Sequence, residues 1–184
     1  MALAFDIREA TPMDSDAIGR IHVEAWQATY AGMIEPGYLA RLDPGTWATR
    51  WREAIGRQRA GRVRYGKVLV ICAPDQGPVG FGSCGRTRSQ TLPYDGEIET
   101  LYIHPDWQGQ GLGRELLVAL FEELSAAGFL SALVWVVAAN PSRFFYEAMG
   151  GERLAEKTEP FAGCPVAQVA YGWDDLVGWL SAWR

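Results

Sequence analysis

Cysteine and histidine are scarce in this sequence, which limits the kinds of site that the chain can build. Cys72, Cys84 and Cys164 are odd in number and widely spaced, without a C-x-x-C pair. This pattern indicates reduced thiols in a cytoplasmic protein and argues against a disulfide framework. His22 and His104 are the only histidines. With so few nitrogen and sulfur ligands available, we expect no bound metal.

Long apolar runs and an excess of basic residues are also missing. No stretch approaches the roughly 18 consecutive apolar residues of a membrane span, and residues 1–8 lack the basic region and apolar core of a secretory signal. The net charge is −5, with acidic and basic residues interspersed. We therefore expect a cytoplasmic protein that binds neither a membrane nor nucleic acid.

No linker, internal repeat or low-complexity segment divides the chain. A length of 184 residues fits one domain that buries its core without disulfides or metals. We predict a single domain over residues 1–184, in which residues 174–184 form a short C-terminal tail. The sequence leaves the role of this tail open.

One stretch, residues 97–117, has the pattern of a strand, a glycine turn and the beginning of a helix. Gly109, Gly111 and Gly113 have no Cβ, so the backbone there can adopt a positive φ and approach a ligand closely. The first N–H groups of the following helix have no intrahelical partner, and the helix dipole adds positive charge at that end. The stretch therefore predicts a site for a diphosphate group.

Two familiar phosphate-binding motifs do not fit. A dinucleotide fingerprint, G-x-G-x-x-G, counted from Gly111 ends at Leu116 instead of glycine. Residues 61–67 match most of a P-loop, but Val68 stands where serine or threonine would bind magnesium, and the run precedes a strand. A nucleotide-binding protein is therefore a disfavoured alternative, and we interpret residues 61–67 as an exposed basic connector.

The remaining sequence predicts alternating strands and helices. A first helix follows a cap at Asp14 or Ser15, and a later one starts with Asn140 as its cap and Pro141 at its first position. Residues 132–138 are continuously apolar, as expected for a strand buried on both faces of a parallel βαβ unit. We expect strands at residues 5–10, 68–73, 79–85, 97–103, 132–138, 152–158 and 166–173.

The glycine turn also carries a resemblance to a known family. Gln108-x-x-Gly111-x-Gly113 begins five residues after Ile103. This spacing resembles the signature of the GNAT acyltransferase superfamily, in which Arg or Gln, then Gly, then Gly or Ala follow a Val or Ile that closes a strand. The resemblance covers nearly the whole chain. It implies an α/β GNAT fold, with a mixed central sheet, splayed parallel strands and flanking helices.

The resemblance implies acetyl-CoA as co-substrate. In the family, the pantetheine arm lies between the splayed strands, and the diphosphate rests on amides of the glycine turn. Gln108 stands where arginine is commoner, so a charge contribution from that side chain is lost. The cofactor-binding residues that the resemblance implies are Leu101, Tyr102, Ile103, Gln108, Gly109, Gln110, Gly111, Leu112, Gly113, Arg114, Asn140 and Tyr146.

The implied reaction is direct attack of a primary amine on the thioester in a ternary complex. An amine with a pKa near ~10 is mostly protonated at neutral pH and must first lose a proton. Glu97 is the first candidate base, because some family members carry a carboxylate six residues before the position of Ile103. Glu99 is the second, since a bulge would change which side chain faces the site. Tyr146 resembles the acid that protonates the leaving thiolate; solvated glutamates and a core tyrosine are the alternatives.

The sequence does not identify the acceptor, and a small amine or a protein N-terminus both fit. Trp26 and Tyr30 on the first helix are candidates for the acceptor wall as well as for the core. We interpret His22, on the same face, as a partly buried histidine with satisfied nitrogens. A homodimer is compatible with the sequence. The alternative function is a catalytically silent module that binds or senses acyl-CoA.

Overall fold

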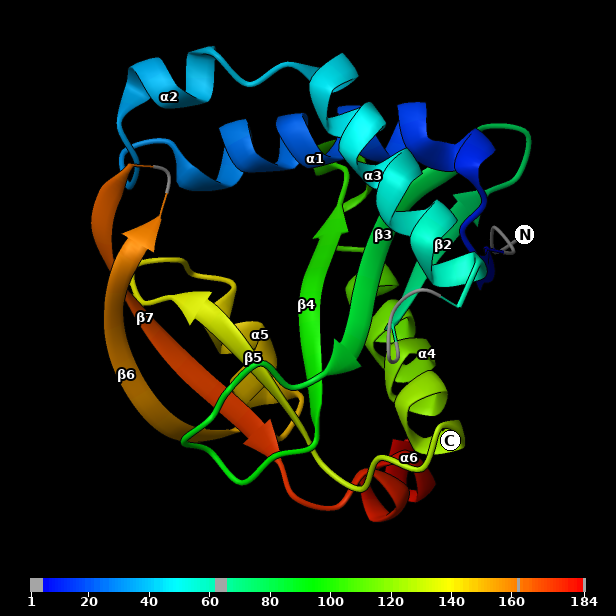
Figure 1. Cartoon of the computed structure of the whole chain (residues 1–184), viewed down its shortest axis with the longest axis vertical. Coiled ribbons are helices and arrows are strands. Elements are labelled where there is room, and N and C mark those ends of the chain that lie inside the picture. Colours follow the sequence, from blue (N-terminus) through cyan, green and yellow to red (C-terminus); the bar gives the residue numbers. More distant parts are fainter. Residues whose placement is uncertain (1–4, 62–65, 162, 184) are drawn as a thin grey trace.

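The computed structural model describes residues 5–61, 66–161 and 163–183 (Figure 1). Most of the connector predicted at residues 61–67 therefore lies outside the described residues. None of the helices in these ranges is long and apolar enough to cross a membrane. The strands are β1 (Asp6–Glu9), β2 (Gly66–Ala73), β3 (Gly77–Arg86), β4 (Gly96–Ile103), β5 (Ala132–Val137), β6 (Glu152–Phe161) and β7 (Cys164–Trp173). The helices are α1 (Ser15–Tyr30), α2 (Pro36–Ala40), α3 (Pro44–Arg59), α4 (Leu112–Ala126), α5 (Arg143–Ala148) and α6 (Leu176–Trp183), with short 3-10 turns η1 (Pro12–Asp14) and η2 (Pro105–Trp107).

The described strands form one seven-stranded sheet in the order β1-β2-β3-β4-β5-β7-β6. β4 and β5 are parallel, and the other neighbouring pairs are antiparallel. Because α4 connects β4 to β5, the predicted parallel βαβ unit is confirmed, and so is the mixed α/β class.

The parallel pair is joined only at its first residues. Gly96, Glu97 and Ile98 pair with residues 132–134 of β5. Farther along, residues 100–103 of β4 pair with β3, while β5 continues beside β7. The two strands therefore diverge toward the glycine turn, as Figure 1 shows. Their facing backbone edges are left without a strand partner there, so these groups need another hydrogen-bonding partner.

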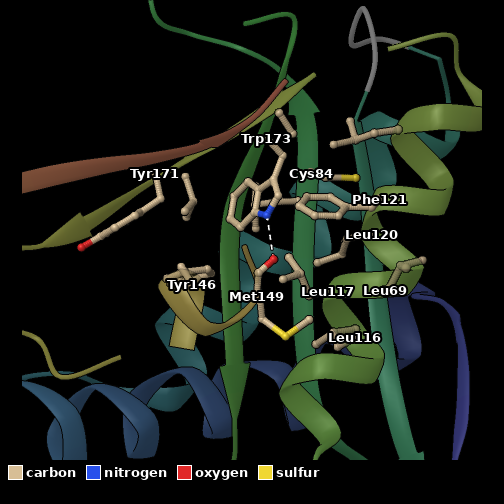
Figure 2. Close-up of a cluster of buried hydrophobic side chains, with 14 of the residues drawn as sticks. Leu69, Cys84, Leu116, Leu117, Leu120, Phe121, Tyr146, Met149, Tyr171 and Trp173 are labelled. Atoms are coloured by element: carbon tan, nitrogen blue, oxygen red, sulfur yellow. Dashed lines mark hydrogen bonds between the residues drawn. The ribbon is translucent and has the colours of Figure 1, made fainter. Parts of the chain in front are cut away.

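Helices cover both faces of the sheet. α1 and α3 enclose a core against β2 and β3 on one face, and α4 and α6 enclose a larger core on the other. The predicted apolar stripe of α4 is confirmed, and Figure 2 shows part of it directed at the strands. The buried residues of the stripe are Leu112, Leu116, Leu117, Leu120, Phe121 and Leu124.

The C-terminal tail is largely the helix α6, which packs on α4. The ring of Trp179 meets that of Phe121 edge-on, with centroids 4.9 Å apart. The indole N–H groups of Trp173 and Trp179 donate to the Met149 carbonyl at 2.9 and 2.7 Å, and Figure 2 shows the first of these bonds. These contacts attach α6 to the end of α5.

Two predicted helix caps act differently in the structure. The Asn140 side chain accepts a hydrogen bond from the Ser142 amide at 2.8 Å, which forms a local turn, and α5 begins only at Arg143. Asp14 makes no side-chain cap to α1 and instead pairs with Arg8 at 2.8 Å. In both places a short-range side-chain bond competes with the capping geometry expected from the sequence.

His22 lies in the core with only 3% of its surface exposed. The Trp47 ring stacks on it at 3.7 Å between centroids, and its Nδ1 accepts a hydrogen bond from Trp51 Nε1 at 3.2 Å. Its Nε2 is buried and has no partner among the described residues, so the expectation of two satisfied nitrogens is wrong. Burial, followed by the nearby charge of Arg50, lowers the pKa of His22 to about 3.

This histidine should make stability depend on pH. Between the folded pKa of about 3 and an unfolded pKa of ~6.5, the unfolded chain binds the additional proton. The free energy of unfolding should therefore fall as the pH drops through this window, by about 1.4 kcal/mol per pH unit well inside it. Urea denaturation at pH 7 and pH 5 should show a weaker dependence in His22→Phe. The dependence should persist in Trp51→Phe, which removes the hydrogen bond but not the titrating ring; equal slopes in all three proteins would refute this role for His22.

Candidate active site

A cavity of about 510 Å³ lies where β4 and β5 diverge. It extends from the glycine turn before α4 to the inner side of α1, so it connects the two faces of the sheet. The residues that line it are Ala25, Thr29 and Tyr30 of α1; Glu99, Thr100, Leu101, Tyr102 and Ile103 of β4; Trp107, Gln108, Gly109, Gly111, Leu112, Gly113 and Arg114 around the turn; Val134, Trp135 and Val136 of β5; and Asn140, Ser142, Phe145, Tyr146 and Met149 in or beside α5.

The glycine turn uses left-handed backbone at two of its three glycines. Gly109 has a φ of +74° and Gly111 a φ of +83°. Gly113 lies in the first turn of α4 and does not have a positive φ, so the expectation for this position is wrong. A Cβ there would make ordinary contact with Phe145 at 3.8 Å. The need for glycine at this position therefore does not come from the backbone angle.

The turn presents a row of free backbone donors. The amides of residues 109–113 donate no hydrogen bond to any of the described residues, and the first amide paired within the turn is that of Arg114, which donates to the Gly111 carbonyl at 3.0 Å. The positive end of the α4 dipole lies at the same place. An anion bound here would meet several unpaired N–H groups, so these residues fit a diphosphate.

Side chains hold the turn relative to the strand. His104 Nδ1 accepts a hydrogen bond from the Asp106 amide at 3.2 Å, and its Nε2 pairs with Glu24 of α1. The amide nitrogen of the Gln108 side chain donates to the Ile103 carbonyl at 3.0 Å. The Gln108 side chain therefore binds the last residue of β4 and fixes the turn to the end of this strand.

β4 contains a bulge at Glu99. Ser83 on β3 lies opposite Thr100, and Cys84 lies opposite Ile98, so Glu99 is the additional residue. The bulge considered from the sequence is therefore present. It places two successive residues, Glu99 and Thr100, on the wall of the cavity.

The Glu99 carboxylate has few polar neighbours. It accepts one hydrogen bond from the Ser83 hydroxyl at 3.3 Å. The Glu99 side chain is exposed to the open cavity, but the protein around its carboxyl group excludes part of the solvent. This desolvation raises the pKa of Glu99, and the Arg88 charge opposes the rise only in part. A raised pKa brings a carboxylate closer to the neutral range in which a general base is most effective.

Glu97 has a different environment and does not line the cavity. Only 2% of the residue is exposed. Its carboxylate accepts hydrogen bonds from the Arg88 backbone amide at 2.9 Å and from Arg88 Nη2 at 2.5 Å. This ion pair holds the loop after β3 against β4, and it leaves Glu99 as the carboxylate at the cavity.

Tyr146 lines the cavity from α5 with its ring fixed in the core. The ring lies edge-on to Phe145 and Trp173, at centroid distances of 5.1 and 6.3 Å. No hydrogen bond joins its hydroxyl to another described residue. Burial and the neighbouring Tyr30 hydroxyl raise the pKa of Tyr146, so it keeps its proton at neutral pH. The hydroxyl is therefore available to donate to a ligand.

Polar side chains form a network at the cavity wall. Trp26 Nε1 donates to the Tyr102 hydroxyl at 3.0 Å. Burial raises the pKa of Tyr30, and hydrogen bonding to Tyr102 and Asn140 opposes this rise. Tyr30 and Asn140 line the cavity, whereas Trp26 is buried behind the wall.

Sequence reasoning missed several wall residues. Thr29, Trp135 and Ser142 line the cavity but carry no motif that would have identified them. They reach it because two strands diverge, and this divergence is a property of the tertiary fold. Conversely, the expected site residues Glu97, Gln110 and Trp26 do not line it.

The thiols lie away from this cavity. None of Cys72, Cys84 and Cys164 belongs to its walls, and all three are free. Burial raises the pKa of the Cys84 thiol to about 12, so this group stays protonated at neutral pH.

Comparison with known proteins agrees with this geometry. The model of the acetyltransferase (GNAT) family matches residues 26–151. The chain is 36% identical over 171 residues to the uncharacterized N-acetyltransferase YuaI of Bacillus subtilis (strain 168), which covers 92% of this chain and 93% of that protein. It is 30% identical over 126 residues to aminoglycoside N(6')-acetyltransferase type 1 of Stenotrophomonas maltophilia, with 65% and 67% covered.

A solved structure shares the fold. The PaiA N-acetyltransferase of Thermoplasma acidophilum, crystallised in complex with coenzyme A, superimposes with a TM-score of 0.69 at 19% identity and covers 93% of this chain and 100% of that one. The family match spans more than half of the sequence and includes the strand, the glycine turn, α4 and α5. The chain therefore belongs to the GNAT family of acetyltransferases.

Proposed function

We propose that this protein transfers an acetyl group from acetyl-CoA to a primary amine by direct attack within a ternary complex. Membership of the GNAT family supports acyl transfer in general. The observation that carries the proposal is the row of backbone amides at residues 109–113, which have no partner among the described residues and lie beside a cavity between two diverging strands. This arrangement suits a long ligand with a diphosphate at one end of the cavity and a reactive group inside.

The residues around the gap would hold the coenzyme. The free amides of the turn would donate hydrogen bonds to the diphosphate, and the edge of β4 at residues 101–103, which does not pair with β5, would offer backbone groups to the pantetheine arm. Leu101, Val134 and Val136 supply apolar walls for the methylene groups of that arm. When bound, acetyl-CoA supplies a thioester carbonyl as the electrophile.

The acceptor would enter from the side of α1. Thr29 of α1 lines the cavity together with Glu99 and Trp135. A protonated amine cannot attack, so a base must first remove a proton. We assign this role to Glu99 instead of Glu97. Glu99 lines the cavity, whereas the Glu97 carboxylate accepts a hydrogen bond from Arg88 and does not line it.

The leaving thiolate would be protonated by Tyr146. A thiol with a reference pKa of ~8.5 is a better leaving group when a donor is positioned next to it. The hydroxyl of Tyr146 keeps its proton at neutral pH and has no partner among the described residues. These two features suit a general acid.

Turnover tests the proposal against a silent acyl-CoA-binding module. Purified protein is incubated with acetyl-CoA and a panel of small aliphatic amines, amino acids, aminoglycosides and peptides with free N-termini, and thiol release is followed. The aminoglycosides are included because one relative is named for them. Thiol release that depends on an amine supports the enzyme. Binding of CoA without turnover on any amine would favour the silent module.

The coenzyme site predicts a specific effect at Gly111. Its φ of +83° disfavours a β-branched residue, at a cost of roughly 1–3 kcal/mol. Gly111→Val should therefore distort the turn and weaken CoA binding at least about tenfold, as measured by calorimetry. Gly128→Val is a matched control, because Gly128 has a φ of +88°, equally open surroundings and a position outside the cavity. Equal CoA affinity of a folded Gly111→Val and the wild type would rule out the turn as the diphosphate site.

A further inference from the structure

Arg114 is paired with a residue at the far end of the sequence. The central carbon of its guanidinium lies 5.0 Å from the centre of the Trp183 ring. Arg114 is in the first turn of α4, is exposed and lines the cavity beside the glycine turn. Trp183 ends α6 and is half-buried. Among the described residues, no carboxylate forms a salt bridge with Arg114.

Trp183 is held by contacts that continue into the core. Its ring stacks on that of Trp179, with centroids 5.3 Å apart. Trp179 in turn packs on Phe121 and donates a hydrogen bond to the Met149 carbonyl. The ring that carries Arg114 therefore rests on a fixed support, which reduces the number of positions that the long arginine side chain can adopt.

The position of Arg114 suits a second anionic group of the coenzyme. Coenzyme A carries a diphosphate and, on its ribose, a 3′-phosphate. The free amides of residues 109–113 already suit the diphosphate. The Arg114 side chain is held against Trp183 of α6, and Arg114 also lines the cavity next to this turn, so its positive charge is available to another phosphate of a coenzyme whose diphosphate rests on the turn. A planar guanidinium is well suited to phosphate.

We propose that Trp183 is a positioning residue that holds Arg114 for the 3′-phosphate of coenzyme A, which makes the C-terminal helix α6 part of the coenzyme site. The proposal rests on the proposed function, because it requires coenzyme A in the cavity. The C-terminal helix α6, whose role the sequence left open, would then contribute to selectivity for CoA over ligands without the 3′-phosphate.

The test compares CoA with dephospho-CoA, which lacks the 3′-phosphate. Calorimetry gives the dissociation constant of each ligand for the full chain and its variants. The wild type should bind CoA more tightly than dephospho-CoA. In Arg114→Gln, the ratio of the two dissociation constants should fall about tenfold. In Trp183→Leu, this ratio should fall about threefold to tenfold, with little change in the affinity for dephospho-CoA. Trp183→Phe keeps an aromatic face and should retain most of the preference, and the double variant should be no worse than Arg114→Gln.

A matched control comes from another arginine on an aromatic ring. The Arg86 guanidinium lies 5.4 Å from the centre of the Phe129 ring and does not line the cavity. Arg86→Gln removes one positive charge and should leave the preference for CoA unchanged. If it reduces the preference as much as Arg114→Gln does, the effect is one of net charge and the proposal fails.

Further results of these binding measurements would contradict the proposed role of Trp183 and Arg114. A wild type with no preference for CoA, an unchanged preference in a folded Trp183→Leu, or an equal loss for both ligands would overturn the proposal. If Trp183→Leu does not melt cooperatively, Arg114→Lys replaces it, since lysine keeps the charge without the planar stack and should lose most of the preference; a retained preference would overturn the proposal. Failure of the wild type to bind either ligand would instead count against the proposed function.

Discussion

Tyr146→Phe is expected to lower kcat on the order of 10²-fold while CoA affinity and melting temperature stay close to those of the wild type. The substitution keeps the ring that packs on Phe145 and Trp173, so the core should not change. It removes the hydroxyl of a residue that lines the cavity, and this hydroxyl has no partner among the described residues. Steady-state kinetics with an amine found in the screen, together with thermal melts, measure the effect.

Tyr171 provides a matched control for this substitution. It is fully buried, and its hydroxyl donates to Glu147 at 2.5 Å. Tyr171→Phe should therefore lower stability by roughly 1 kcal/mol and leave kcat unchanged, because this partly buried hydrogen bond contributes to folding but not to chemistry. If Tyr146→Phe shows the same pattern, with lower stability and normal kcat, then Tyr146 is not the acid.

Glu99→Gln is expected to lower kcat/KM on the order of 10²-fold near neutral pH, the usual scale for a positioned base. Partial desolvation raises the pKa of Glu99, so wild-type kcat/KM should fall at acidic pH as this carboxylate gains a proton. The variant has no such group, so its remaining activity should follow the free amine and recover as the pH rises. Profiles of kcat/KM from about pH 5.5 to about pH 9.5 test this prediction. This interval covers protonation of the Glu99 carboxylate at its acidic end and release of the free amine at its basic end.

Glu97→Gln is the matched control on the same strand. Its carboxylate is buried and bound by Arg88, so this change should lower stability by about 1–3 kcal/mol and have the smaller effect on kcat/KM. The opposite order, with a large kinetic loss only in Glu97→Gln, would return the base to that residue. If neither substitution slows the reaction, proton removal proceeds through water or another group.

Local sequence patterns determined much of the fold. Strand periodicity, the apolar stripe of α4 and the glycine turn act over a few residues, so their signals lie within short windows of the chain. Gly109 and Gly111 adopt the left-handed backbone expected of them. The parallel arrangement of β4 and β5 followed from the length of the connection between them.

The sequence by itself therefore determined the elements, the glycine turn and, through the spacing of Gln108 and Gly111, the family resemblance that the comparisons bear out. The tertiary structure alone decided which side chains meet. The bulge directs Glu99 to the cavity, and Arg88 binds the Glu97 carboxylate. The packing of separate helices leaves His22 Nε2 without a partner among the described residues. These outcomes depend on contacts between residues far apart in the chain, and such contacts leave no periodic signal in either partner's own segment.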